Sequence, residues 1–261
     1  MGKFFNVDVK PDIVAGDIST VIDSDKSHLD IGAGEIVFDW TAVDVPKGSC
    51  MLRSITAIVN AEDATYAAGS LTTYHLIFAK SVNGVAPTTM GVTNAAQTAC
   101  FDLKDHYVGS AILESTAATG TISGPAFHVA YHGSDNSVTG GGLPLVIDLE
   151  PHDWNHTNVG YDKLYVMGFQ MDVRGYHTAV ECSSALSASD SATIAVDGTD
   201  ATKIFSVGDT VYVHDVDTAI GTVKSVSALA IVLNADNAVA VANNDEMINA
   251  NPIRLKLGFE K

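Results

Sequence analysis

Residues 204–233 read IFSVGDTVYVHDVDTAIGTVKSVSALAIVL, and this stretch decides how the rest of the chain is interpreted. Short runs of β-branched and aromatic residues alternate in it with turn residues, above all Gly208-Asp209. Runs bounded by glycine, asparagine and aspartate are typical of short strands joined by tight turns. We expect Gly208-Asp209 to lead into a strand over 210–213, and Gly221 to allow a bend in the following strand. The pattern predicts a small closed β-barrel.

The remainder of the chain also predicts strands, and it has little helical periodicity. Runs such as 73–78 and 163–171 alternate with period two, which is typical of strands with one solvent-facing side. Turn-rich stretches separate the runs. The predicted fold class is all-β, an antiparallel β-sandwich of jelly-roll type, because the connections look too irregular for an up-and-down barrel. The expected strands are 35–40, 51–60, 72–79, 98–103, 111–114, 126–132, 143–150, 163–172 and 176–182.

Domain boundaries follow from composition. Residues 183–190 are small and polar, which predicts a flexible linker. The last run, 253–259, has apolar residues at every second position and cannot bury that face alone, so we expect it to return to the sandwich. Residues 1–182 plus 251–261 therefore form the predicted sandwich domain. Residues 191–250 form a small β-barrel inserted before the last strand.

Charge and composition exclude several classes of function. The chain has 31 acidic and 14 basic residues and a formal net charge of −17, which argues against binding to nucleic acid or to an anionic membrane. No apolar run approaches the roughly 18 residues that span a membrane, and residues 1–8 lack the apolar core of a signal peptide. Cys50, Cys100 and Cys182 are odd in number and far apart, which favours buried free thiols in a reducing cytoplasm.

Clusters with possible chemistry are few. His152, Asp153 and His156 have a spacing that can hold a metal on a helix, but the segment follows Pro151 and an ordered loop is favoured. Acidic residues in 23–30 and 215–217 can supply oxygens to calcium, yet neither run has the order of an EF-hand loop. Solvated turns are favoured there, with calcium at an oligomer contact left open. No nucleophile motif is present. We expect no enzymatic activity, no cofactor and no metal.

The inserted segment resembles SH3-like and KOW-type barrels in the rhythm of 207–213 and 220–226. Relatives of that shape often bind RNA or peptides, but here acidic residues stand where RNA-binding proteins carry basic ones. Phe205 is expected in the barrel core. A possible exposed binding face is formed by Tyr212 and His214 together with Trp154 of the other domain.

Taken as a whole, the chain resembles the structural proteins of tailed bacteriophages, in particular the jelly-roll head decoration (cement) proteins. The resemblance rests on 48–60 (GSCMLRSITAIVN), 71–79 (LTTYHLIFA), 148–150 and 162–170, together with the inserted barrel. It implies a virion protein on the outer capsid surface, assembled in the host cytoplasm. It also implies the major capsid protein as partner and a homo-oligomer, with a trimer favoured.

An N-terminal arm is the expected contact with the capsid or with another subunit. Its alternating apolar residues, Phe4 or Phe5 followed by Val7 and Val9, have the pattern of a strand that pairs with a neighbour.

Two other functions stay open. A tail, baseplate or vertex protein of the same virion would share these features. A carbohydrate-binding module would use Trp154 and Tyr161 to stack on sugars, with Asp153 and Asn155 bonding hydroxyl groups. Trp40 is a further aromatic candidate, although its place at the end of an apolar strand predicts a core position.

Overall fold

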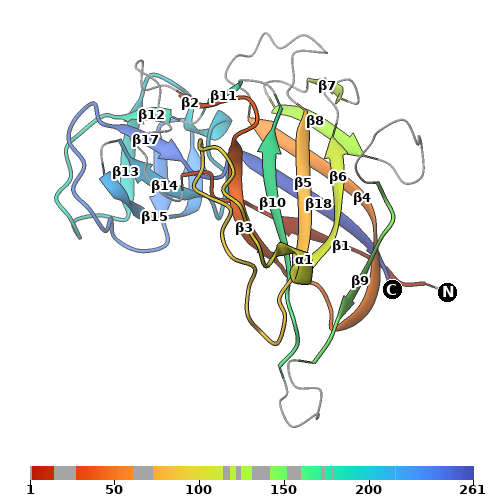
Figure 1. The fold of residues 1–261 in the computed structure, drawn as a ribbon. Coiled ribbons are helices and arrows are strands. Elements are labelled where there is room, and N and C mark those ends of the chain that lie inside the picture. The colour runs from red at the N-terminus through yellow and green to blue at the C-terminus, as the bar shows by residue number, and fades with distance from the viewer. Residues whose placement is uncertain are drawn as a thin grey trace.

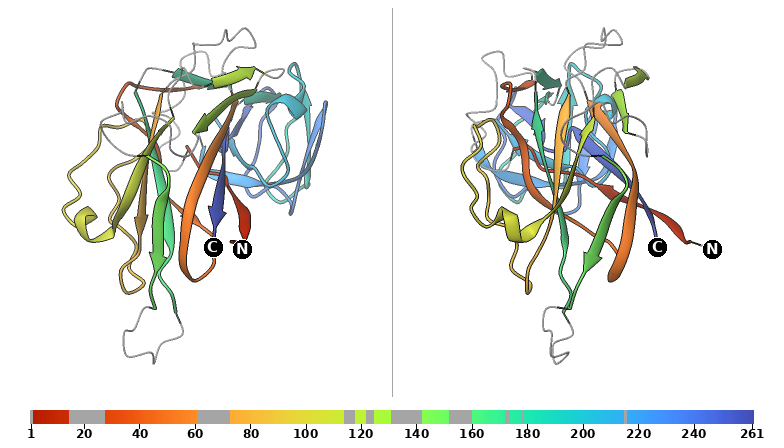
Figure 2. Two further views of the ribbon diagram at one scale, coloured as in Figure 1. Left: turned by 90° about the vertical axis from the view of Figure 1, so that its right-hand side faces the viewer. Right: turned by 45° about the vertical axis from the view of Figure 1, so that its right-hand side comes forward.

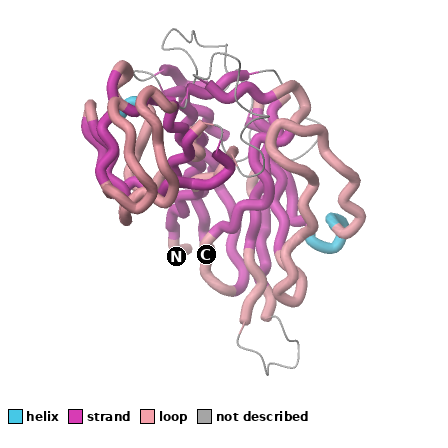
Figure 3. Tube along the Cα trace, turned by 90° about the vertical axis from the view of Figure 1, so that its left-hand side faces the viewer, coloured by secondary structure: helices cyan, strands magenta, loops and turns pink. Residues whose placement is uncertain are grey.

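The computed structural model describes residues 2–14, 28–60, 73–113, 118–121, 125–130, 142–151, 160–171, 174–177, 179–214 and 216–261. Almost all of its elements are strands, which confirms the all-β prediction (Figures 1 and 3). The strands are β1 (Phe4–Val9), β2 (His28–Ile31), β3 (Ile36–Val43), β4 (Gly48–Asn60), β5 (Tyr74–Lys80), β6 (Tyr107–Leu113), β7 (Ala118–Thr121), β8 (Pro125–Ala130), β9 (Leu145–Leu149), β10 (Leu164–Gln170), β11 (Arg174–His177), β12 (Ala179–Cys182), β13 (Thr193–Asp197), β14 (Thr210–Val213), β15 (Val216–Ser227), β16 (Ala230–Leu233), β17 (Glu246–Asn249) and β18 (Ile253–Glu260). A short α-helix, α1 (Leu103–His106), and a 3₁₀ turn (Ala201–Lys203) complete the elements.

Two antiparallel sheets form a jelly-roll sandwich. One sheet has the order β1-β18-β4-β8-β7, with β9 paired to the other half of β4, and the second has the order β3-β10-β5-β6. In chain order, the eight positions of the sandwich are β1, β3, β4, β5, β6, the pair β8 and β9, β10 and β18. Numbered 1 to 8 in that order, they lie as 1-8-3-6 in the first sheet and as 2-7-4-5 in the second. This is the strand order of a jelly roll. The two sheets are the two layers seen in Figure 2.

The sandwich core lies between these layers and depends on the last strand. In β18 the side chains of Ile253, Leu255, Leu257 and Phe259 are all buried. The strand pairs with β1 on one side and with β4 on the other, so β18 is an interior strand of the sheet. The period-two pattern of residues 253–259 thus supplies one of the central rows of the core.

The inserted barrel closes on itself. Its strands follow the order β12-β13-β16-β15-β14-β17, with β12 and β17 also paired. Phe205 is buried in the barrel core as predicted. Gly208 has a φ of 85°, and the N–H of Asp209 donates to the carbonyl of Ser206, which confirms the predicted turn into β14. The pairing of β14 with β15 shifts register beside Gly221, where a bend was predicted.

Two predicted boundaries differ from the structure. The predicted strand 176–182 is divided between β11 and β12, and β12 belongs to the barrel rather than to the sandwich. The predicted linker 183–190 is part of the barrel wall, since Leu186 and Val241 exchange two main-chain hydrogen bonds. The buried side chain of Asn237 also accepts from the N–H groups of Asp190 and Ser191 and donates to the carbonyl of Ser187. Small polar residues here are ordered by these bonds.

A third difference concerns residues 98–103, which were predicted as a strand. They belong to a long excursion between β5 and β6 that covers the outer face of the second sheet. Leu103 and Cys100 pack there against a cluster of Ile36, Met90, Met167 and Phe169. Cys100 and Leu103 attach this excursion to the sheet, whereas Phe101 is 88% exposed.

The central position of β18 gives a stability prediction. Leu257→Ala should lower the free energy of unfolding by about 2–5 kcal/mol, because it removes a fully buried side chain from the sandwich core. Lys256→Ala, its exposed neighbour on the same strand, should change that free energy by less than about 0.5 kcal/mol. Urea unfolding of the two variants measures the difference. Equal effects would show that β18 does not contribute to the sandwich core as described.

Candidate functional site

The N-terminal strand is placed in the chain's own sheet. β1 pairs with β18, and its residues Phe5, Val7 and Val9 pack against the sandwich core. The ring of Phe5 stacks on Phe259 with 5.3 Å between centroids. Phe4 is 73% exposed, and Phe5 and Val7 are half-buried. β1 is therefore a strand of the chain's own sheet, and the contact of its apolar residues with a capsid or another subunit stays a prediction.

The other side of β1 is an open sheet edge. Lys3 and Lys261 exchange two main-chain hydrogen bonds, each with N to O of 2.9 Å. Hydrogen-bonded pairs recur at every second residue of an antiparallel ladder. The main-chain N–H and C=O groups of Phe5 and Val7 therefore point to β18, as those of Lys3 do. The same groups of Phe4, Asn6 and Asp8 point away from β18. Within the described part of the chain, β1 ends the order of its sheet.

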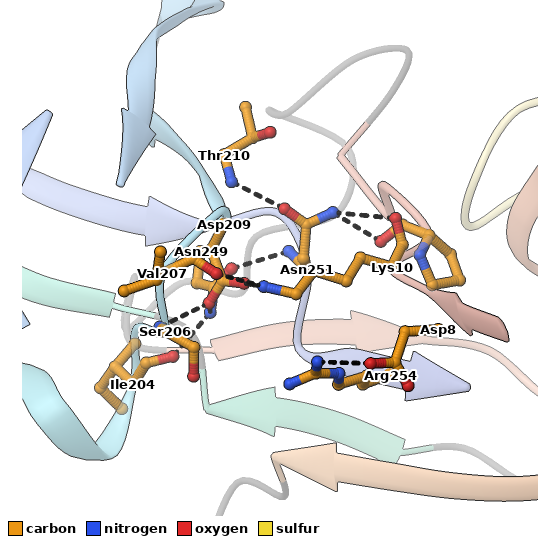
Figure 4. A network of polar contacts seen from close by, with 11 residues as sticks. Asp8, Lys10, Ile204, Ser206, Val207, Asp209, Thr210, Asn249, Asn251 and Arg254 are labelled. Carbon is orange, nitrogen blue, oxygen red and sulfur yellow. Dashed lines mark hydrogen bonds and ion pairs between the residues drawn. The ribbon is translucent and has the colours of Figure 1, made fainter. Parts of the chain in front are cut away.

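The segment that follows β1 binds the barrel (Figure 4). The ammonium group of Lys10 donates to Oδ1 of Asp209 over 2.7 Å and to the carbonyl of Val207 over 2.6 Å. Oδ2 of Asp209 accepts from the N–H of Ser206 over 2.7 Å and from Nδ2 of Asn249 over 3.0 Å. The carboxylate is thus hydrogen-bonded at both oxygens while its side chain is only 4% exposed.

Asn251 joins three parts of the chain at the same place (Figure 4). Its Oδ1 accepts from the N–H of Thr210 at the start of β14, and its Nδ2 donates to the carbonyl of Pro11. One main-chain bond, from Ile13 to Ala250, lies alongside. The exit of the barrel, the barrel itself and the N-terminal segment are therefore bonded to one another.

The predicted binding face on the barrel is not exposed as expected. Tyr212 is half-buried and packs against the sandwich core, so it lies at the junction between the two domains. Burial, and then the nearby carboxylate of Asp12, raise the pKa of Tyr212 above its ordinary value. His214 is also half-buried, and its N–H donates to the carbonyl of Glu246. Sequence reasoning missed this because the docking of the barrel leaves no local motif.

A polar cluster that the sequence did not indicate lies in the excursion over the second sheet. The thiol of Cys100 donates to Oδ1 of Asp102 over 2.8 Å, and the hydroxyl of Thr88 donates to Oδ2 over 2.6 Å. Nδ1 of the buried His106 lies 2.8 Å from the carbonyl of Lys80 and so carries a proton, while its Nε2 lies 3.8 Å from Oδ2 of Asp102.

This cluster holds its thiol in the protonated state. Burial raises the pKa of Cys100, and the hydrogen bond to Asp102 and the charge of that carboxylate raise it further. A thiol with a raised pKa is a poor nucleophile at neutral pH. The arrangement therefore fixes the excursion in place rather than activating the sulfur. Cys50 and Cys182 are buried free thiols, as predicted.

Trp40 is half-buried on the outer cluster of the second sheet, rather than in the sandwich core, and its indole N–H donates to the carbonyl of Thr88. The ring of Tyr161 lies 4.8 Å from the ammonium group of Lys47. Trp154 and the rest of 152–159 lie outside the described residues, as do Asp23, Asp25 and Asp215.

Neither the described residues nor comparisons with known proteins assign a function to this chain. Among the described residues, no group of three or more histidine, cysteine, aspartate or glutamate side chains is placed to hold a metal ion. The described helices include none that is long and apolar enough to cross a membrane. The chain matches no protein-family model, no curated protein and no solved structure.

The junction predicts a specific dependence on Lys10. Lys10→Met should lower the free energy of unfolding by about 1–3 kcal/mol, because it leaves the buried Asp209 carboxylate without its cation. Lys80→Met is the matched control, since its partner Glu150 is 65% exposed and the loss should stay below about 1 kcal/mol. Equilibrium unfolding in urea compares the two, and an equal loss would mean that the ion pair at the junction adds no more stability than an exposed ion pair.

A second prediction concerns the thiol of Cys100. Asp102→Asn removes a negative charge that raises its pKa, so more thiolate is present at a given pH and alkylation by iodoacetamide at pH 8 should be several-fold faster. Asp105→Asn makes the same change of charge at an exposed neighbour and should leave the rate unchanged. Peptide mass spectrometry follows Cys100 alone. An unchanged rate in Asp102→Asn would contradict the assigned hydrogen bond.

Proposed function

We propose that this chain is a structural protein of a tailed-bacteriophage virion, and that it binds the outer surface of the capsid as a head decoration protein. The observation that carries the proposal is a jelly roll with a closed barrel inserted before its last strand and bonded to it. Decoration proteins that resemble this chain are jelly rolls, and small barrel insertions recur in phage virion proteins. The partner in this proposal is the major capsid protein.

The junction supports this role in physical terms. Lys10, Asp209 and Asn251 hold the barrel against the sandwich through both charged and amide groups. A partner that binds the sandwich therefore holds the barrel at a fixed place. That is what a protein bound at repeated positions on a symmetric lattice requires, because every copy must present the same surface.

The charge of the chain favours the outside of the particle. At a net charge of −17, the protein would be repelled by packaged DNA if it lined the interior. On the outer surface the same charge favours solubility and limits non-specific association between particles. In this arrangement the sandwich contacts the capsid and the barrel projects outward.

The test is the number of copies of this chain on purified virus particles, measured by quantitative mass spectrometry against the major capsid protein. A decoration protein should be present at on the order of hundreds of copies per particle, because capsid lattices repeat its binding site many times. A handful of copies would overturn the decoration role and indicate a tail, baseplate or vertex protein. Absence from the particles would overturn the virion assignment itself.

A further inference from the structure

Within the described part of the chain, no strand pairs with the outer edge of β1. The main-chain groups of Phe4, Asn6 and Asp8 point away from β18, and all three residues are exposed. An edge of this kind can pair with another extended chain, because each outward N–H and C=O group can form the bonds of a further strand.

Apolar side chains beside this edge are also incompletely covered. Val9 is buried, whereas Phe5 and Val7, which point to the same core side of the sheet, are only half-buried. On the neighbouring strand, Leu255 and Leu257 are buried completely. The uncovered surface of Phe5 and Val7 lies where a further strand would run, so such a strand would need apolar residues at alternate positions.

β1 itself has the pattern that this edge requires. If two copies of β1 pair antiparallel about a two-fold axis through Asn6, then Asn6 faces Asn6 of the other copy and Phe4 faces its Asp8. On the core side Phe5 then faces Val7, and the two half-buried residues cover each other. The two Asp8 carboxylates do not face each other in this register, so no like charges are opposed.

Local charge also permits two copies to meet here. Residues 2–10 and 253–261, which contain β1 and β18, carry five basic residues and two acidic ones, in a chain whose net charge is −17. Lys256 is exposed on this sheet, and Arg254 binds Asp8 over 2.8 Å. In an isologous contact the two basic edges face each other, and the pairing of Arg254 with Asp8 within each copy reduces the positive charge that they bring together.

We infer that two copies of this chain associate through their β1 strands, which join the two sheets into one continuous sheet. The interface is isologous, since the same strand is used on both sides. The inference does not rest on the proposed function. It also differs from the threefold assembly that the resemblance to decoration proteins implies.

Analytical ultracentrifugation of the purified full chain tests this contact. The wild type should be a dimer at micromolar concentration. Asn6→Pro removes an N–H that points away from β18, so the fold is kept while two intermolecular bonds are lost and the dimer dissociation constant rises about tenfold or more. Asn6→Ala keeps the N–H and should stay dimeric. The thermal midpoint of each variant reports whether the fold is intact.

A second pair of variants keeps the test decisive if Asn6→Pro fails to fold. Asn6→Lys places two like charges at the two-fold axis and should give a monomer. Asn6→Cys should form a disulfide-linked dimer on oxidation, whereas Asp8→Cys should not, because Asp8 does not face itself in this register. A monomeric or trimeric wild type, or a dimer dissociation constant that is unchanged in folded Asn6→Pro and Asn6→Lys, would overturn the inference.

Discussion

The pairing of β12 with β17 brings the beginning and the end of the barrel side by side, and the sandwich can be completed only because of it. β10 and β18 are the seventh and eighth strands of the jelly roll, yet the whole barrel lies between them in the chain. β18 must return to a slot between β1 and β4. Since Ala179 faces Ile248 across the β12–β17 pair, the chain leaves the barrel close to where it entered. The closure of the barrel thus reduces the loop that the sandwich would otherwise have to close.

The Gly208-Asp209 turn has two roles. Asp209 belongs to the Gly-Asp turn that starts β14, and one of its oxygens accepts the N–H of Ser206 within that turn. Its other oxygen binds Lys10, which follows the first strand of the sandwich. A residue required for the local turn is therefore also used to attach the barrel. Loss of the lysine leaves a buried carboxylate without a cation, which is unfavourable in free energy. Loss of a surface cation has little effect because its partner is hydrated.

Much of this fold could be predicted from local patterns, and the arrangement between domains could not. The alternation of residues 253–259 identified a strand that needs a partner sheet, and Gly208-Asp209 identified a barrel turn, because both signals are local. The alternating pattern around Tyr212 is the same whether its side chain faces solvent or a neighbouring domain. Similarly, Cys100 and Leu103 belong to an apolar run that fits a strand, but they cover the outer face of a sheet. Local periodicity indicates that a side chain is buried but does not indicate what covers it.

Residues 2–14 connect the open edge of the first sheet with the junction between the sandwich and the barrel. β1 provides the open edge of the first sheet, and Lys10 and Pro11 directly after it bind the barrel through Asp209 and Asn251. A strand that pairs with β1 restrains the main chain up to Asp8, two residues before the Lys10 contact. The hydrogen bonds of Lys10 and Pro11 hold the barrel next to the end of that edge. The N-terminal segment is therefore a shared structural element of the edge and the junction. A substitution within Phe4–Val9 changes the edge, whereas one at Lys10 or Pro11 changes the junction.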